Sequence, residues 1–348
     1  MKREWQDFLT NAGAEFEQDT VISYGNPERE QRMIHTGLVI CDLSHLGLIS
    51  VQGEDAAEYL QGQLTNDIHQ VTPEHSQLSA ACSPKGRMLA NFRIFQRNNS
   101  YYLRLPLEQL ESILKRLRMF MMMARVTIED SSDSLIRIGV SGPDIEKHLA
   151  SIIPQLPASN NAVTQSAGYT VIRLAGPNPR FEIYAELDNI KKLWNHLDVH
   201  AAAVGAGPWR MLDILAGIPT IYPVTAEAFV PQMTNMQLID GVNFKKGCYT
   251  GQEIVARMQY LGKLKRRMFR IHITSTNSVN PGDKLYSANT TSGQGTGIVV
   301  DAQADPDGTF EGLAVIDIND AENNKLQLHD ENGPEVTIKD LPYSMEIL

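Results

Sequence analysis

Hydrophobic and polar positions alternate along residues 46–128 in a way that predicts strands separated by two amphipathic helices. The predicted strands are Leu46–Val51, Leu78–Cys82, Met88–Phe95, Tyr101–Leu105 and Val126–Ile128, and the predicted helices are Asp55–Leu64 and Leu107–Met123. This order is that of a split βαβ, or ferredoxin-like, unit. We interpret Met119–Met123 as the buried end of the second helix, with an adaptable ligand surface as the alternative.

The same order of elements recurs directly afterwards. Its predicted strands and helices are Leu135–Val140, the helix Asp144–Ile153, the hairpin Tyr169–Leu174 with Phe181–Ala185, the helix Asp188–Leu197 and the strand Val199–Val204. Ahead of both units, Trp5–Phe16 is typical of a short helix that leads to a loop near Tyr24–Pro27. The chain therefore has two related α/β units in tandem.

The pattern changes again towards the C-terminus. Pro208–Leu215 predicts a helix, and short β-like runs separated by Gly, Asn, Asp and Pro follow Lys263. These runs indicate an all-β module in the form of a small barrel. The fold class is α+β, and the predicted divisions are 1–130, 131–204, a return segment 205–262 and the barrel 263–348.

The stretch from Phe244 to Arg257 carries the strongest chemical signal. Thr250 and Glu253 have the spacing of a capping box, which predicts a helix that begins near Gly251. Cys248 then lies outside the positive end of that helix, after two lysines, and both features favour a reactive thiolate. The alternative is a small buried cysteine that only fills space.

Composition narrows the classes of function. The 348-residue chain has a net charge of −10, which argues against general affinity for nucleic acids or anionic membranes. Its three cysteines form no C-x-x-C pair, and its nine histidines show no ligand spacing, so we expect no bound metal. With neither a secretory signal nor a membrane-spanning run, the sequence predicts a cytoplasmic protein.

Six basic residues and no acidic residue lie between Arg257 and Arg270. Such a cluster can hold a polyglutamate tail or a phosphate backbone, and it can equally be a solvated linker followed by a first barrel strand. No aromatic-basic RNA motif accompanies it, so direct nucleic-acid binding is not expected.

Two segments resemble the signature of the YgfZ family of folate-binding proteins. They are Lys-Gly-Cys-Tyr-Thr-Gly-Gln-Glu at 246–253 and the preceding stretch Phe229–Asn235. Proteins of this family are relatives of the glycine-cleavage T-protein, an aminomethyltransferase. Upstream, His35–Leu38 and Asp42–Gly47 resemble the start of the T-protein fold, so the resemblance covers nearly the whole chain.

The resemblance implies two ferredoxin-like parts and a C-terminal barrel in a ring around a central hole that binds tetrahydrofolate. It also implies a role in the assembly or repair of iron–sulfur enzymes. Through partners such as a tRNA methylthiotransferase, that role extends to tRNA modification. The predicted partners are thus folate and iron–sulfur enzymes or assembly factors.

Three departures from the T-protein pattern bear on activity. The stretch that supplies the T-protein's acids ends here in Ala90-Asn91, so aminomethyl transfer lacks its carboxylate. Leu215 occupies a position where the family often has a pterin-binding Glu, and Leu46 replaces a tryptophan of some members. We therefore expect an accessory protein that is non-catalytic or only weakly catalytic. The alternatives are a folate-dependent one-carbon transferase and a scaffold that has lost folate binding.

Cys248 is the candidate functional thiol, and Trp209 matches a folate-contacting tryptophan of the family whose indole can stack on a pterin. A buried core residue is the alternative for Trp209. The further candidates for folate contact are Leu46, Gln232, Asn235, Lys246, Tyr249, Gln252, Glu253 and Arg257.

Overall fold

The computed structural model describes residues 1–287, 295–323 and 325–345. The chain forms two compact units, each built from three separate stretches of sequence. The first unit comprises Met1–Leu60, Ile68–Gln77 and Phe92–Leu212, and the second comprises Gln61–Asp67, Leu78–Asn91 and Asp213–Leu348. The division into four segments made from the sequence stays a prediction.

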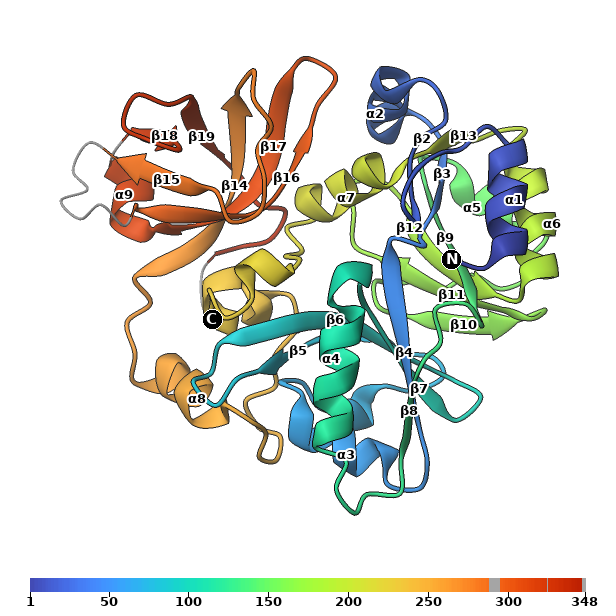
Figure 1. Cartoon of the computed structure of the whole chain (residues 1–348), viewed down its shortest axis with the longest axis horizontal. Coiled ribbons are helices and arrows are strands. Elements are labelled where there is room, and N and C mark those ends of the chain that lie inside the picture. Colours follow the sequence, from blue (N-terminus) through green and yellow to red (C-terminus); the bar gives the residue numbers. More distant parts are fainter. Residues whose placement is uncertain (288–294, 324, 346–348) are drawn as a thin grey trace. The chain divides into compact units, whose positions relative to one another are not determined.

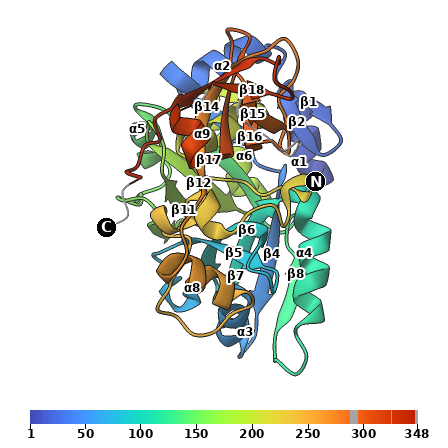
Figure 2. The same cartoon turned by 90° about the vertical axis from the view of Figure 1, so that its left-hand side faces the viewer.

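A five-stranded sheet follows the ferredoxin-like order predicted for residues 46–128. Its elements are β4 (Leu46–Gln52), α3 (Ala56–Gln63), β5 (Gln77–Cys82), β6 (Met88–Arg97), β7 (Ser100–Pro106), α4 (Leu107–Met119) and β8 (Thr127–Asp130). The strands lie in the order β5-β6-β7-β4-β8, and α4 packs on β4, β7 and β8 (Figures 1 and 2). The predicted fold class is confirmed for this unit, with β5 as an added edge strand.

The second sheet, of six strands, lies wholly within the first unit. Its elements are β3 (Val39–Asp42), β9 (Ile136–Ser141), α5 (Ile145–Ala150), β10 (Val163–Ser166), β11 (Tyr169–Leu174), β12 (Arg180–Ala185), α6 (Leu187–Leu197) and β13 (Ala202–Val204). The order β10-β11-β12-β9-β3-β13 is ferredoxin-like with two additional strands, because β10 lies at one edge and β3 lies between β9 and β13. Sequence analysis missed β3 because its four residues are all buried and do not alternate.

The N-terminal prediction was partly wrong. α1 (Arg3–Asn11) ends well before Phe16, because Gly13 adopts φ +91° and the chain then forms the hairpin β1 (Glu15–Glu17) and β2 (Thr20–Ser23). The region predicted as a loop opens α2 (Pro27–Thr36), whose N-cap Asn26 accepts a hydrogen bond from the backbone N–H of Arg29. A proline in the first turn also fits a helix start.

Aromatic side chains from α1 and α6 form the centre of the first unit's core. Trp5 stacks on Phe8 and meets the edge of Trp194, with ring centroids 5.2 and 5.6 Å apart. The Trp5 indole N–H donates to Asp42 Oδ1 at 2.7 Å, which ties the helix to the end of β3. Burial raises the pKa of Asp42.

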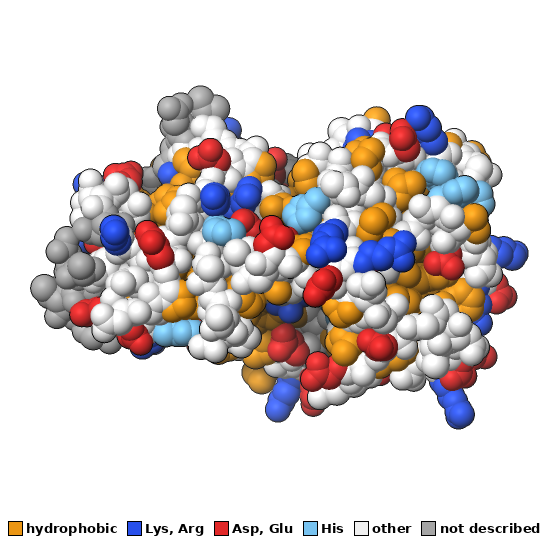
Figure 3. Space-filling model, turned by 90° about the horizontal axis from the view of Figure 1, so that it is seen from above, with side chains coloured by type: hydrophobic (Ala, Val, Ile, Leu, Met, Phe, Trp, Pro, Cys, Tyr) orange, Lys and Arg blue, Asp and Glu red, His pale blue; other side chains and the backbone are white. Residues whose placement is uncertain are grey.

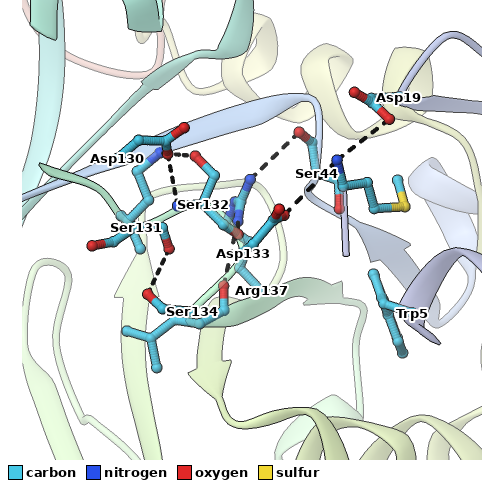
Figure 4. Close-up of polar contacts among 12 residues, drawn as sticks. Trp5, Asp19, Ser44, Asp130, Ser131, Ser132, Asp133, Ser134 and Arg137 are labelled. Carbon is cyan, nitrogen blue, oxygen red and sulfur yellow. Dashed lines mark hydrogen bonds and ion pairs between the residues drawn. The ribbon is translucent and has the colours of Figure 1, made fainter. Parts of the chain in front are cut away.

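Arg137 of β9 holds together two loops of the first unit (Figure 4). The residue is 3% exposed, and its guanidinium donates to the carbonyls of Leu43, Ser44 and Leu46 on one side and of Ser132 and Leu135 on the other. The loop ahead of β4 is therefore fixed to the loop ahead of β9. Burial lowers the pKa of Arg137.

The C-terminal part of the second unit is a closed six-stranded barrel, as predicted. Its strands are β14 (Arg266–Thr274), β15 (Lys284–Ser287), β16 (Gly297–Ala304), β17 (Thr309–Asp317), β18 (Leu326–Leu328) and β19 (Glu335–Lys339), in the order β14-β17-β16-β15-β18-β19. The short helix α9 (Ile318–Asn323), which follows β17, was not predicted. Inward-facing residues such as Ile271, Val299 and Leu328 form the barrel's core.

Helices and turns connect these parts. They are α7 (Ala206–Leu215), α8 (Gln252–Tyr260) and 3-10 helices at Ile68–Gln70, Pro223–Thr225, Pro231–Thr234 and Met236–Leu238. No helix within the described ranges is long and apolar enough to cross a bilayer.

Candidate functional site

The loop from Phe244 to Gly251 precedes α8 and carries the candidate thiol. The helix starts at Gln252, close to the prediction, but the capping box was wrong: Gly251 is the N-cap, and no side chain caps the helix. Gly251 adopts φ +85°, and a Cβ there would lie 2.4 Å from the carbonyl oxygen of Ser83. Because glycine takes the cap position, Thr250 falls one residue too early to cap the helix.

Lys246 anchors this loop from within. Its ammonium donates to the carbonyls of Gln61, Leu64 and Asn66 at 2.7, 2.6 and 3.0 Å, so all three N–H groups are used. The side chain is 9% exposed. Burial lowers the pKa of Lys246 to about 8, although the negative charge of Asp67 acts to raise it. Within the second unit, this lysine is a structural clamp at the end of α3.

Tyr249 and Gln252 complete the anchoring of the loop. The Tyr249 ring is buried beside Lys246, with the ammonium 5.1 Å from the ring centroid, and burial raises the pKa of its hydroxyl. The Gln252 amide donates to the carbonyls of Lys246 and Gly247, both at 3.4 Å. Lys246, Tyr249 and Gln252 therefore lie together in the loop and at the start of α8.

Cys248 is exposed, whereas the other two cysteines of the chain, Cys41 and Cys82, are buried. Burial raises the pKa of the Cys41 thiol well above its usual range. Cys248 is thus the thiol that solution reagents can reach, and the space-filling alternative does not apply to it. Glu253 and Arg257, on α8, are also exposed.

Gln232 and Asn235 lie in the 3-10 segment of the second unit and are almost fully buried. The Gln232 amide donates to the carbonyl of Val255 in α8 at 2.7 Å, and the Asn235 amide donates to the carbonyl of Met268 in β14 at 2.9 Å. Within the described part of the chain, Gln232 Oε1 and Asn235 Oδ1 accept no hydrogen bond. Two buried acceptors are therefore available to a ligand.

Trp209 and Leu46 belong to the first unit. The guanidinium of Arg180 lies 4.3 Å from the centroid of the Trp209 ring, and a Cβ on Gly139 would lie 2.5 Å from that ring. The ring is 1% exposed, and its Nε1–H has no acceptor among the described residues. Leu46, at the start of β4, is buried and its carbonyl accepts from Arg137.

Sequence analysis missed Arg180, which is fully buried at the start of β12. An arginine directly after a Pro-rich turn normally indicates an exposed hairpin end, so the sequence carried no signal that it covers an indole ring.

Asn91, which with Ala90 departs from the T-protein pattern expected from the resemblance, is tied to the main chain of the second unit. Its amide donates to the carbonyl of Pro219 at 2.8 Å and accepts from the N–H of Ile221 at 2.9 Å. Ala90 is fully buried. Neither residue supplies a carboxylate.

On the face shown in Figure 3, Lys and Arg side chains are interspersed with Asp and Glu side chains. Among the residues that the structure describes, no group of three His, Cys, Asp or Glu side chains is placed to hold a metal ion.

Comparisons with known proteins agree with this architecture. Residues 12–211 match the family model of the GCVT N-terminal domain. The solved structure of glycine cleavage system aminomethyltransferase T from Bartonella henselae superposes with a TM-score of 0.80 at 16% identity, over 97% of this chain and 96% of that one. At that identity, the likeness establishes the fold. The class is therefore a GCVT-type protein with a C-terminal barrel.

Closer relatives define the family. The chain is 32% identical over 308 residues to the tRNA-modifying protein YgfZ of Yersinia pestis (strain Pestoides F), covering 88% of this chain and 93% of that protein. It is 33% identical over 311 residues to the protein of the same name from Photorhabdus laumondii, with the same coverage. The chain belongs to the YgfZ family.

Proposed function

We propose that this protein binds a tetrahydrofolate and acts as a cytoplasmic accessory factor in tRNA modification. The family assignment supports the link to tRNA modification, because the relatives are named for it. The folate part is supported by the GCVT-type domain. Under this proposal, the protein serves iron–sulfur enzymes, among them a tRNA methylthiotransferase.

The observation that carries the ligand proposal is a buried polar atom of the first unit, Trp209 Nε1, which has no acceptor in the described part of the chain. A pterin presents carbonyl acceptors that complement this indole donor. The second unit has two buried acceptors without donors among the described residues, Gln232 Oε1 and Asn235 Oδ1, which suit the N–H groups of a ligand. Buried polar atoms of this kind normally have partners, and a ligand supplies them here.

Under this proposal, Trp209 contacts the ligand through its indole N–H. Stacking of the ligand on the ring face is not proposed, because Arg180 lies over the ring. Lys246 positions the loop and does not touch the ligand, since its three N–H groups already donate to carbonyls. Asn91 and Ala90 offer no anion for a developing positive charge, so the protein holds the folate without aminomethyl transfer.

A titration tests the ligand. Tetrahydrofolate and 5-formyltetrahydrofolate should quench tryptophan fluorescence with micromolar dissociation constants. Trp209→Phe removes the proposed N–H donor and should weaken binding about tenfold. Trp194→Phe is the matched control, because Trp194 is equally buried in the same unit and its N–H also lacks an acceptor among the described residues. An absence of saturation at millimolar ligand, or equal effects of both substitutions, rules the site out and favours the scaffold alternative.

A second test addresses the thiol, which we propose to be the group that contacts client iron–sulfur enzymes. In a strain lacking this protein, Cys248→Ser should fail to restore methylthiolated tRNA nucleosides, measured by mass spectrometry. Lys245→Ala, at an exposed neighbouring position, should restore them fully. Iodoacetamide should label one thiol in the native protein and three after unfolding. Normal tRNA methylthiolation with Cys248→Ser would refute the role of the thiol.

A further inference from the structure

The turn after α4 presents an unusual group of exposed apolar side chains. Met119, Phe120, Met122 and Met123 are 66%, 43%, 89% and 95% exposed. The interpretation of this stretch as the buried end of a helix is therefore wrong, because the helix ends at Met119 and Met122 turns the chain with φ +40°. Soluble proteins seldom expose adjacent large apolar side chains without a binding role.

Specific contacts hold this turn in place. After it, Arg125 donates to both carboxylate oxygens of Asp55 at 3.1 Å, and its backbone N–H donates to the same carboxylate at 2.8 Å. Before it, the Arg118 side chain donates to the carbonyl of Ile128 in β8 at 2.9 Å. A hydrogen bond from the Ala124 N–H to the Met121 carbonyl closes the turn itself. The backbone of the turn is therefore held in place, and its methionine side chains are exposed.

The same stretch is basic. Residues 115–125 contain Lys115, Arg116, Arg118 and Arg125 and no acidic residue. The Arg116 guanidinium lies 5.0 Å from the centroid of the Phe120 ring, a contact between side chains that are both enriched in protein interfaces. Methionine adds a flexible apolar surface that adapts to different partner side chains.

We propose that the Met119–Met123 turn is a docking surface for a partner protein that offers an acidic amphipathic helix. The apolar face of that helix covers the methionines and Phe120, and its Asp and Glu side chains pair with the cations of residues 115–118. A protein fits better than a membrane or a nucleic acid. At the base of the turn, Arg125 is paired with Glu54 and Asp55, which confines the cations that face an acidic partner to residues 115–118 and favours the spaced carboxylates of one helix over a continuous anionic surface. None of the residues of this turn belongs to the proposed folate site.

The test uses the full chain and three fluorescein-labelled peptides of about 18 residues, long enough for five helical turns. One carries a leucine stripe flanked by Glu, the second has the same composition with the stripe scrambled, and the third has Lys in place of Glu. Fluorescence anisotropy should show micromolar binding of the first peptide and at least about tenfold weaker binding of the other two.

Met122→Ser/Met123→Ser should weaken binding of the acidic peptide about tenfold and leave the thermal midpoint within about 2 °C, since both side chains are exposed. The control Ile22→Ser/Val199→Ser alters two exposed apolar residues elsewhere in the first unit and should bind as the wild type does. Equal affinity for all three peptides, or no loss in the methionine variant, overturns the proposal. So does sedimentation with phosphatidylglycerol-containing vesicles that this variant abolishes, because it makes the surface a membrane anchor.

Discussion

Replacing Lys246 with methionine is expected to lower the free energy of unfolding by about 3 kcal/mol, because three carbonyls lose the ammonium group that donates to them. Methionine keeps most of the apolar volume, so the loss reports on hydrogen bonding. Urea titration followed by circular dichroism measures it. Iodoacetamide should also label Cys248 at a changed rate, since its loop is no longer anchored.

Lys245 provides the matched control, because it adjoins Lys246 in sequence but is exposed. Lys245→Met should change the free energy of unfolding by less than about 0.5 kcal/mol. If both substitutions cost the same, Lys246 is not the clamp that its contacts indicate.

The Lys246 clamp also has a pH dependence. The folded-state pKa is about 8, below the ordinary 10.5, so the unfolded chain binds more protons between those values. The stability of the wild type relative to Lys246→Met should therefore increase as pH rises from about 8 to about 10.5.

Replacing Arg137 with methionine is expected to cost about 4 kcal/mol of the free energy of unfolding. Five carbonyls in two loops lose their guanidinium donor, and Asp42 loses a nearby cation. Arg137→Lys should recover only part of the loss, since an ammonium cannot reach both loops with its three donors. Thermal unfolding measures both variants.

Arg32, which is 64% exposed, is the control for Arg137. Arg32→Met should leave the melting temperature nearly unchanged. A small effect of Arg137→Met would mean that water replaces the guanidinium in both loops.

Pattern was sufficient to predict the longer elements. α4 repeats its apolar residues at helical spacing, and β4 and β17 are mainly apolar runs of seven and nine residues, so the ferredoxin-like order and the barrel followed from them. β3 was missed because its buried run has only four residues, and α2 was missed because its N-cap Asn26 lies beside a Gly-Asn-Pro turn signal. In both places, the local sequence pattern does not specify the secondary structure, which depends on tertiary contacts.

The candidate site could be predicted in part. The sequence correctly indicated a helix that begins near Gly251, although the capping box that suggested it is absent, and the candidate thiol of Cys248 before this helix is exposed. The sequence could not indicate that Lys246 faces inward and Lys245 outward, because the carbonyls that bind Lys246 come from residues 180 to 185 positions earlier. For the same reason, the burial of Trp209 against Arg180 could not be read from local sequence.

The discontinuous second unit has a consequence for biosynthesis and for dissection of the chain. Its first two stretches, Gln61–Asp67 and Leu78–Asn91, leave the ribosome long before the third, which begins at Asp213. During translation, the carbonyls of Gln61, Leu64 and Asn66 therefore have no hydrogen bond from Lys246 until that residue has been synthesised. A fragment that begins at Asp213 retains the Cys248 loop and the barrel but lacks those carbonyls. Truncation of the chain at Asp213 thus keeps the whole sequence of the Cys248 loop but removes the carbonyls that hold Lys246 in place.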